Sequence, residues 1–265
     1  MNSKLRIESV LNATLLSNVI VTIDDFNLSV LKLKKFPEIE LPNNRRLGHL
    51  VEIIVSELIK ASENYTILHE NLQIIQNKNT IGELDFIIKN LETQEIIHLE
   101  LAYKFYLFDP TLSSNVKHCW IGPNRKDALH EKLEKLQQKQ FPLLYHEITK
   151  SHLPNIHIKN ITQKLCILAY LFVPYQYKVQ LHNDYQEAVK GYYMDFEMFK
   201  QLDHPEKNYY IPTKKEWGIN PATHTNWFDF LTTEKTILEN LSAKHSLLCW
   251  QKQGSSFENF FIVWW

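Results

Sequence analysis

The chain has 265 residues, 44% of them hydrophobic and 22% charged, which is ordinary for a globular protein and long enough for one large domain or a core with an added subdomain. Its formal net charge is −1 at pH 7, which excludes an overall positive field. Any binding to a polyanion must therefore come from a local patch.

The first 43 residues predict a short helix followed by a connector that contains Pro37 and Pro42. A stronger helix begins after Asn44, which can serve as its N-cap, and continues to about residue 61. Its apolar stripe consists of Leu47, Leu50, Val51, Ile54, Leu58 and Ile59. Glu52 falls on another face of this helix.

Three segments rich in Ile, Leu, Phe and Tyr follow. They cover Tyr65–Gln76, Ile81–Lys89 and Ile96–Leu107, and the short turn-like segments 77–79 and 90–94 separate them. This pattern predicts a three-stranded antiparallel meander.

A second helix is expected after Asn124, with Asp127 at its third position as in a capping box. Arg125 and Lys126 would then lie in its first turn. Farther along the helix, Lys132, Lys135 and Lys139 continue a basic side that could hold phosphates of a nucleic-acid backbone. Acidic residues lie between these lysines, so a salt-bridged surface is the alternative interpretation.

The continuous apolar run Leu165–Val173 predicts a strand covered on both faces. Together, the elements indicate an α/β (α+β) fold with a mixed central sheet flanked by helices. We expect an N-terminal helical arm and connector over residues 1–43, a core over 44–175 and a small β-rich extension over 176–265. In the extension, strands are expected at 191–199, 209–212, 246–251 and 260–265, and a helix at 233–244.

Acidic residues occur on two neighbouring predicted strands. Asp85 lies within an otherwise apolar run, and a hairpin of suitable register sets it beside Glu100. Side chains two residues apart share a strand face, so Glu100 lies on the same face as Lys104. The opposite face is apolar and is expected to pack on a helix, which leaves the face of Glu100 polar and exposed unless it forms a site.

Two carboxylates that lie close together repel each other unless a proton or a cation lies between them. Mg²⁺ or Mn²⁺ suits such a pair, since Mg²⁺ takes one or two carboxylates and completes its shell with waters and phosphate oxygens. A metal held there would polarise a phosphodiester and lower the pKa of an attacking water. A nearby ammonium would stabilise the developing charge.

The order of elements resembles the PD-(D/E)XK restriction-endonuclease-like fold. A helix that bears Glu52 is followed by a strand with the motif Gly-x-x-Asp, whose Asp is Asp85, and then by a strand that carries Glu100 and Lys104. More narrowly, Arg46-Leu47-Gly48, Glu100-Leu101-Ala102-x-Lys104-Phe105-Tyr106-Leu107 and Trp120-Ile121-Gly122-Pro123 resemble an uncharacterised bacterial family of unknown function. The resemblance implies that Asp85 and Glu100 are metal ligands and that Glu52 assists. It also implies a catalytic lysine, but Ala102 stands where the motif has that lysine, and Lys104 is the nearest candidate on the same face.

The sequence thus favours a metal-dependent nuclease that hydrolyses phosphodiester bonds of DNA or RNA. The alternative is a catalytically inactive module of the same fold that binds nucleic acid or a protein partner. The Tyr- and Trp-rich C-terminal region would be the surface for a protein partner.

Three cysteines without a CxxC pair favour a reducing compartment, and we expect the protein in the cytoplasm. No uncharged run approaches the roughly 20 apolar residues of a membrane helix. We therefore expect no association with a membrane.

Overall fold

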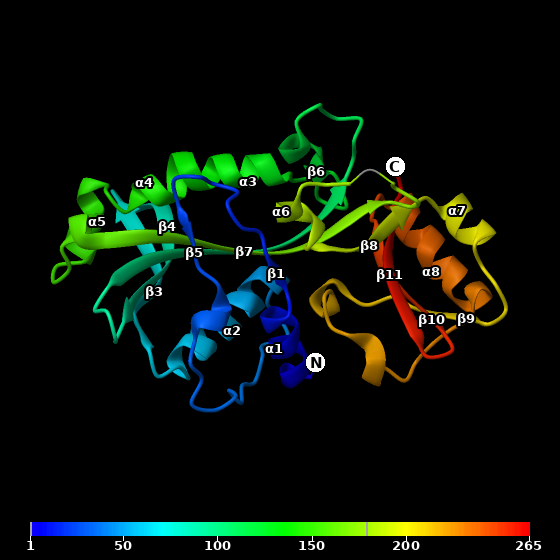
Figure 1. Cartoon of the computed structure of the whole chain (residues 1–265), viewed down its shortest axis with the longest axis horizontal. Coiled ribbons are helices and arrows are strands. Elements are labelled where there is room, and N and C mark those ends of the chain that lie inside the picture. The colour runs from blue at the N-terminus through cyan, green and yellow to red at the C-terminus, as the bar shows by residue number, and fades with distance from the viewer. Residues whose placement is uncertain (1, 179) are drawn as a thin grey trace. The chain divides into compact units, whose positions relative to one another are not determined.

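The computed structural model describes residues 2–178 and 180–265 (Figure 1). The chain forms two compact units, one of residues 1–103 and 131–168 and the other of residues 104–130 and 169–265. Strands β5 and β7 each pass from one unit into the other. Both units combine β-sheet with packed helices, so the α/β class and the mixed sheet flanked by helices are confirmed.

The first unit contains a mixed sheet with the strand order β3-β4-β5-β7. The strands are β3 (Tyr65–Gln76), β4 (Asn79–Asn90), β5 (Ile96–Phe108) and β7 (Ile161–Pro174), with β1 (Thr14–Leu15) and β2 (Asp24–Asp25) added on β7. The pairs β3–β4 and β4–β5 are antiparallel and β2–β7 is parallel. The predicted meander is therefore confirmed, with strand bounds within about two residues of those expected.

Helices cover both faces of this sheet in Figure 1. The helices of the unit are α1 (Ser3–Leu11), α2 (Leu47–Lys60), α3 (Leu129–Lys135), α4 (Phe141–Leu143) and α5 (Glu147–His152). The apolar stripe of α2 is buried, as its spacing predicts. On the other face, Leu143 and Leu144 pack with Ile87 of β4 in one apolar cluster. The sheet is therefore a middle layer.

Both predicted helix starts are wrong. Helix α2 begins at Leu47, with Arg46 rather than Asn44 at the N-cap position and no side-chain cap. Helix α3 begins at Leu129, because Asn124 and the residues after it form a loop in which Arg125 has φ +55° and Gly122 N donates to Asp127 O at 2.7 Å. Asn124 itself accepts a hydrogen bond from Ser246 N at 2.8 Å, so its side chain is not available as a cap.

The second unit continues from the end of β7 with the order β7-β8-β11-β10-β9. Its elements are β6 (Trp120–Ile121), α6 (Asn183–Gln186), β8 (Val189–Met194), α7 (Phe196–Gln201), β9 (Lys207–Tyr210), α8 (Phe230–Ser242), β10 (Leu247–Gln253) and β11 (Ser256–Ile262). The strand expected over 191–199 ends at Met194, because Asp195 accepts a hydrogen bond from Met198 N and caps α7.

Short 3₁₀ helices connect these elements at Leu28–Val30, Val116–Cys119, Ile158–Asn160, Lys214–Glu216 and Pro221–Thr223. Among the helices of the described residues, none has the length and apolar character needed to cross a membrane.

Candidate acidic site on strands β4 and β5

Strands β4 and β5 bring Asp85 and Glu100 opposite each other. Their antiparallel ladder runs to the pair Phe86–Leu99, and the same register continued by one pair matches Asp85 with Glu100. Next to this pair, the Asp85 side chain bonds to the backbone of the neighbouring strand: its Oδ2 accepts a hydrogen bond from Leu101 N at 2.9 Å. The register predicted for the acid pair is the one that the fold adopts.

The face of β5 that carries Glu100 is buried, not exposed as an amphipathic strand would have it. Glu100 and His98 are both 0% exposed. A continuous helical segment, called the rod below, covers this face. It starts with α3, passes through a π-helical turn over Leu136–Gln140 and ends in α4. π-Helical turns inside helices often occur at functional sites. The expectation of an open polar face is therefore wrong.

Both oxygens of the Glu100 carboxyl group accept hydrogen bonds from side chains. His98 Nε2 lies 2.9 Å from Oε1, and Gln140 Nε2 lies 2.5 Å from Oε2. The other ring nitrogen of His98 lies 3.1 Å from the amide nitrogen of Gln163, which is a donor. His98 therefore carries its proton on Nε2 and donates it to Glu100. Burial lowers the pKa of His98 to about 4, so the ring is neutral at pH 7.

The acid pair titrates near neutral pH. Burial, followed by the charge of Glu100, raises the pKa of Asp85 to about 7 against the hydrogen bond from Leu101 N. Burial also raises the pKa of Glu100 to about 7, with the charge of Glu83 adding to the effect. Asp85 is only partly buried, whereas Glu100 is sealed beneath the rod, so Asp85 is the more accessible member of the pair.

Glu52 on helix α2 belongs to the same electrostatic cluster. Burial raises its pKa, and its negative charge in turn raises the pKa of Asp85. Within residues 2–178 and 180–265, however, no group of three or more His, Cys, Asp or Glu side chains is arranged to hold a metal ion. The carboxyl groups that the strands bring together are the pair Asp85 and Glu100, and Mg²⁺ is commonly bound through one or two carboxylates.

Besides Lys135, whose charge lowers the pKa of Glu100, the cation of helix α3 that acts on this cluster is Lys132. Its charge lowers the pKa values of Asp85, Glu100 and Glu52. Its ammonium donates to Gln140 Oε1 at 2.9 Å, and the other end of the same amide donates to Glu100. The sequence offered Lys132 only as one lysine of a basic helix side.

Lys104, the lysine expected from the motif, has a carboxylate partner in another segment. Its ammonium lies 2.9 Å from Asp127 Oδ2, in the loop before α3. The catalytic role predicted for Lys104 has no contact with the acid pair to support it.

The two basic residues expected to bind phosphates lie in the same loop. Arg125 Nη1 pairs with Asp109 Oδ2 at 3.2 Å, and its guanidinium lies 4.5 Å from the centre of the Trp265 ring. Lys126 is exposed. Neither residue lies in the first turn of a helix, so the sequence argument that placed them there does not hold.

A comparison with protein-family models matches residues 25–257 to a family described as Domain of unknown function (DUF1853). Searches among curated proteins and among solved structures gave no match. The matched range includes every residue of the acidic cluster, from Glu52 to Gln140, and extends through both compact units. By this match the chain belongs to the DUF1853 family.

Proposed function

We propose that this protein is a metal-dependent nuclease that hydrolyses phosphodiester bonds of DNA or RNA, built on a PD-(D/E)XK-like core. The observation that supports the proposal most strongly is the pair Asp85 and Glu100 on neighbouring strands, each with its pKa raised to about 7. Perturbed carboxyl groups that face each other are typical of functional sites.

Mg²⁺ or Mn²⁺ is the cofactor that suits this donor set. Asp85 Oδ2 is held by Leu101 N, while Asp85 Oδ1 accepts no hydrogen bond from any residue that the structure describes. When bound, the ion would polarise the phosphodiester and lower the pKa of an attacking water. Glu100, fixed by His98 and Gln140, would be the second ligand, and Glu52 would assist from α2.

The lysine of this site is Lys132 in the proposal, not Lys104. The charge of Lys132 already acts on the pKa values of both members of the acid pair, whereas Lys104 is held by Asp127. A positive charge next to a phosphate group stabilises the negative charge that builds up as the bond to the leaving oxygen breaks. A lysine from the covering helix would thus compensate for Ala102 on the strand.

A second candidate function is a catalytically inactive module that binds nucleic acid or a protein partner. It is favoured by one observation: Glu100 is 0% exposed and both of its oxygens are already bound by protein donors. A metal ion on Glu100 would have to reach a fully buried group and share its oxygens with these two donors.

The two functions are separated by incubating the purified protein with single- and double-stranded DNA and RNA in the presence of Mn²⁺. For the nuclease, Asp85→Asn and Glu100→Gln are each expected to lower the cleavage rate at least about 100-fold, because a metal ligand supplies several kcal/mol of transition-state stabilisation. Glu57→Gln, at a half-buried position of α2 where the carboxylate pairs with Lys60, is the matched control and should keep the rate. Calorimetric titration with Mn²⁺ reports on the ligands without depending on activity.

Cleavage that survives both substitutions would exclude this acid pair. No cleavage of any substrate, together with no Mn²⁺ binding, would favour the inactive module.

A further inference from the structure

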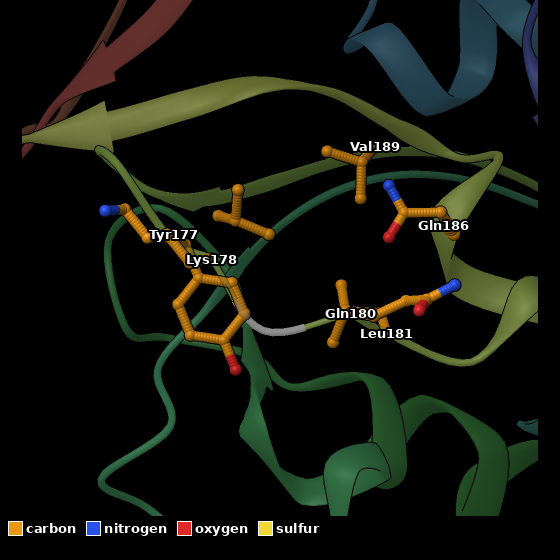
Figure 2. Close-up of a pocket in the computed structure, with 7 residues that line it drawn as sticks. Tyr177, Lys178, Gln180, Leu181, Gln186 and Val189 are labelled. Atoms are coloured by element: carbon orange, nitrogen blue, oxygen red, sulfur yellow. The ribbon is translucent and has the colours of Figure 1, made fainter.

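The second unit has pockets that the acidic site does not use. Figure 2 shows one of about 360 Å³, with Tyr177 and Gln186 on opposite sides. Its lining includes Lys178 and Gln180, which flank a residue outside the described part of the chain. Another pocket, of about 290 Å³, is lined only by described residues of the second unit, and its chemistry is better defined.

This second pocket lies on one face of the sheet formed by β8, β11, β10 and β9. Gln251 of β10 pairs with Glu258 of β11 and with Tyr209 of β9, so the three side chains share that face. Beside the pocket, an apolar cluster that includes Phe199 of α7 and Ile237 of α8 fills the same face. The pocket is therefore an uncovered part of a face that helices otherwise bury.

Aromatic rings form one side of the pocket. The rings of Tyr175 and Tyr192 have centroids 5.1 Å apart, and Tyr192 is stacked nearly parallel on Phe260 with centroids 5.3 Å apart. The Tyr192 hydroxyl donates to Glu258 Oε2 at 2.8 Å, and burial and this bond raise its pKa, so the ring stays neutral. The Tyr175 ring is tilted by 59° to the Tyr192 ring, so the two rings form an angled apolar wall.

One polar side chain in the pocket is buried and lacks a partner. Gln251 is 9% exposed, and its amide makes no hydrogen bond to any residue that the structure describes. Its amide atoms do not belong to the fully buried polar atoms of the described residues that lack a partner, so the amide is reached from the pocket and is available for a ligand. Gln253, two residues along the same strand face, also lines the pocket, but it is exposed and its Nε2 donates to Glu206 at 3.2 Å.

We propose that this pocket binds a single unpaired nucleobase, with its ring against the two tyrosines and its polar edge on the Gln251 amide. A glutamine amide offers one donor and one acceptor side by side, which matches the paired donor and acceptor on a base edge. Unpaired bases commonly stack on aromatic side chains.

The charge and the volume of the pocket restrict the class of ligand further. The pocket carries one positive and one negative side chain, Lys207 and Glu258, and the Lys207 ammonium donates to Leu202 O at 2.6 Å. A phosphate group would therefore find no net positive charge in the pocket, whereas a neutral ring does not need one. The volume is at the lower limit of about 300 Å³ for small-molecule sites, enough for one base. That the base belongs to a nucleic-acid strand, and not to a free nucleoside, rests on the proposed function.

The test is calorimetric titration of the full chain, in EDTA, with the four ribonucleosides, a single-stranded oligonucleotide and glucose. We expect saturable binding of at least one nucleoside. Gln251→Leu should weaken that binding by about tenfold or more, since it removes a bidentate contact. Gln251→Glu keeps the size, replaces the NH2 donor with an acceptor oxygen and adds a negative charge, and should weaken the binding as well. Gln253→Leu is the matched control and should change the affinity less than about twofold.

The titrations with nucleosides and with the oligonucleotide also show whether the bound base comes from a free nucleoside or from a strand. Tighter binding of the oligonucleotide assigns a base within a strand, and binding of the nucleoside alone assigns a free nucleoside, and both support the pocket. No binding of any nucleoside or oligonucleotide, binding of glucose in their place, or equal losses at Gln251 and Gln253 would overturn it. Asp85→Asn should leave the affinity for the nucleoside unchanged, because Asp85 does not line this pocket, so a failure of the nuclease proposal is distinguishable from a failure of this one.

Discussion

At the scale of single residues, the proposed activity of the acidic site depends on which lysine lies close enough to act on its carboxyl groups. Lys132 lowers the pKa values of Asp85 and Glu100 and contacts Gln140, which itself donates to Glu100. Lys104 is paired with Asp127. We therefore expect Lys132→Met to lower the Mn²⁺-dependent cleavage rate about 100-fold, the size of effect seen when one charge-stabilising donor is removed.

Lys104→Met is the control for that experiment. Loss of its ion pair with a partly exposed carboxylate should cost at most about 1 kcal/mol of stability and little activity. A larger loss of cleavage in Lys104→Met than in Lys132→Met would restore Lys104 as the site lysine.

The acid pair also sets the pH dependence of stability in the metal-free protein. In the folded state the pKa of Asp85 rises from 3.8 to about 7 and that of Glu100 from 4.5 to about 7. The stability that these two groups contribute is fully present below about pH 4 and is lost as the pH rises through 7. His98 opposes them, because its pKa falls from 6.5 to about 4, and its contribution is lost as the pH falls through that range.

Two carboxyl groups outweigh one imidazole, so this cluster lowers the free energy of unfolding between about pH 5 and pH 7. Urea unfolding in EDTA across this range measures the effect. Asp85→Asn, which cannot titrate, should flatten the decline relative to the natural chain. Curves for the two proteins that stay parallel from pH 5 to pH 7 would contradict the raised pKa of Asp85.

At the scale of the elements, the hairpin of β3 and β4 holds Asp85 in register. Its turn places both Asn77 and Lys78 at positive φ, 49° and 65°. Asparagine tolerates this region, whereas lysine there costs roughly 1 kcal/mol, and Asn-Gly is the preferred pair for such a turn.

We therefore expect Lys78→Gly to raise the free energy of unfolding by up to about 1 kcal/mol, as measured by urea titration. Lys89→Gly, near the end of β4 but paired with strands on both sides, is the contrast and should destabilise the protein. A Lys78→Gly protein less stable than the natural chain would mean that the turn does not adopt these angles.

The elements also show how far the sequence could predict the fold. The three strands of the meander were found because their apolar runs are long and end at turn residues. The helix starts were missed because Asn44 and Asn124 are good caps only by residue type, and the Asn124 side chain is bound to Ser246, which lies far along the chain. The strand predicted over 191–199 was too long because the capping role of Asp195 was not recognised.

The site was predictable to a similar degree. Asp85 and Glu100 follow from strand register, which depends on a local hairpin. Lys132 and Gln140 do not, because their place near Glu100 depends on the π-helical turn after α3 and on how that rod lies over β5. The burial of Glu100 was missed for the same reason: one strand does not reveal that a helix covers its polar face.

At the scale of the whole molecule, the two compact units share two strands. The first part of β5 carries Glu100 in one unit, and its later part, from Lys104, belongs to the other. β7 divides in the same way after Leu168. A strand cannot readily lose its pairing in one half while the other half stays ordered, so we expect the units to unfold together.

The tryptophans make this expectation measurable, because all six lie in the second unit: Trp120, Trp217, Trp227, Trp250, Trp264 and Trp265. Fluorescence then follows the second unit, while far-ultraviolet circular dichroism follows both. The two thermal midpoints should coincide in the natural chain.

Two glycine substitutions, one in each unit, sharpen the test. A Cβ at Gly191 would lie 2.1 Å from the backbone oxygen of Asn259, so Gly191→Ala should cost at least about 1 kcal/mol in the second unit. A Cβ at Gly48 of α2 meets nothing within 4 Å, so Gly48→Ala should stabilise the first unit by up to about 1 kcal/mol.

If the units unfold as one, each substitution shifts both midpoints together, downward for Gly191→Ala and upward for Gly48→Ala. A circular dichroism curve that splits into two steps in Gly191→Ala, with only the first step matched by fluorescence, would show that the units unfold independently despite the strands they share.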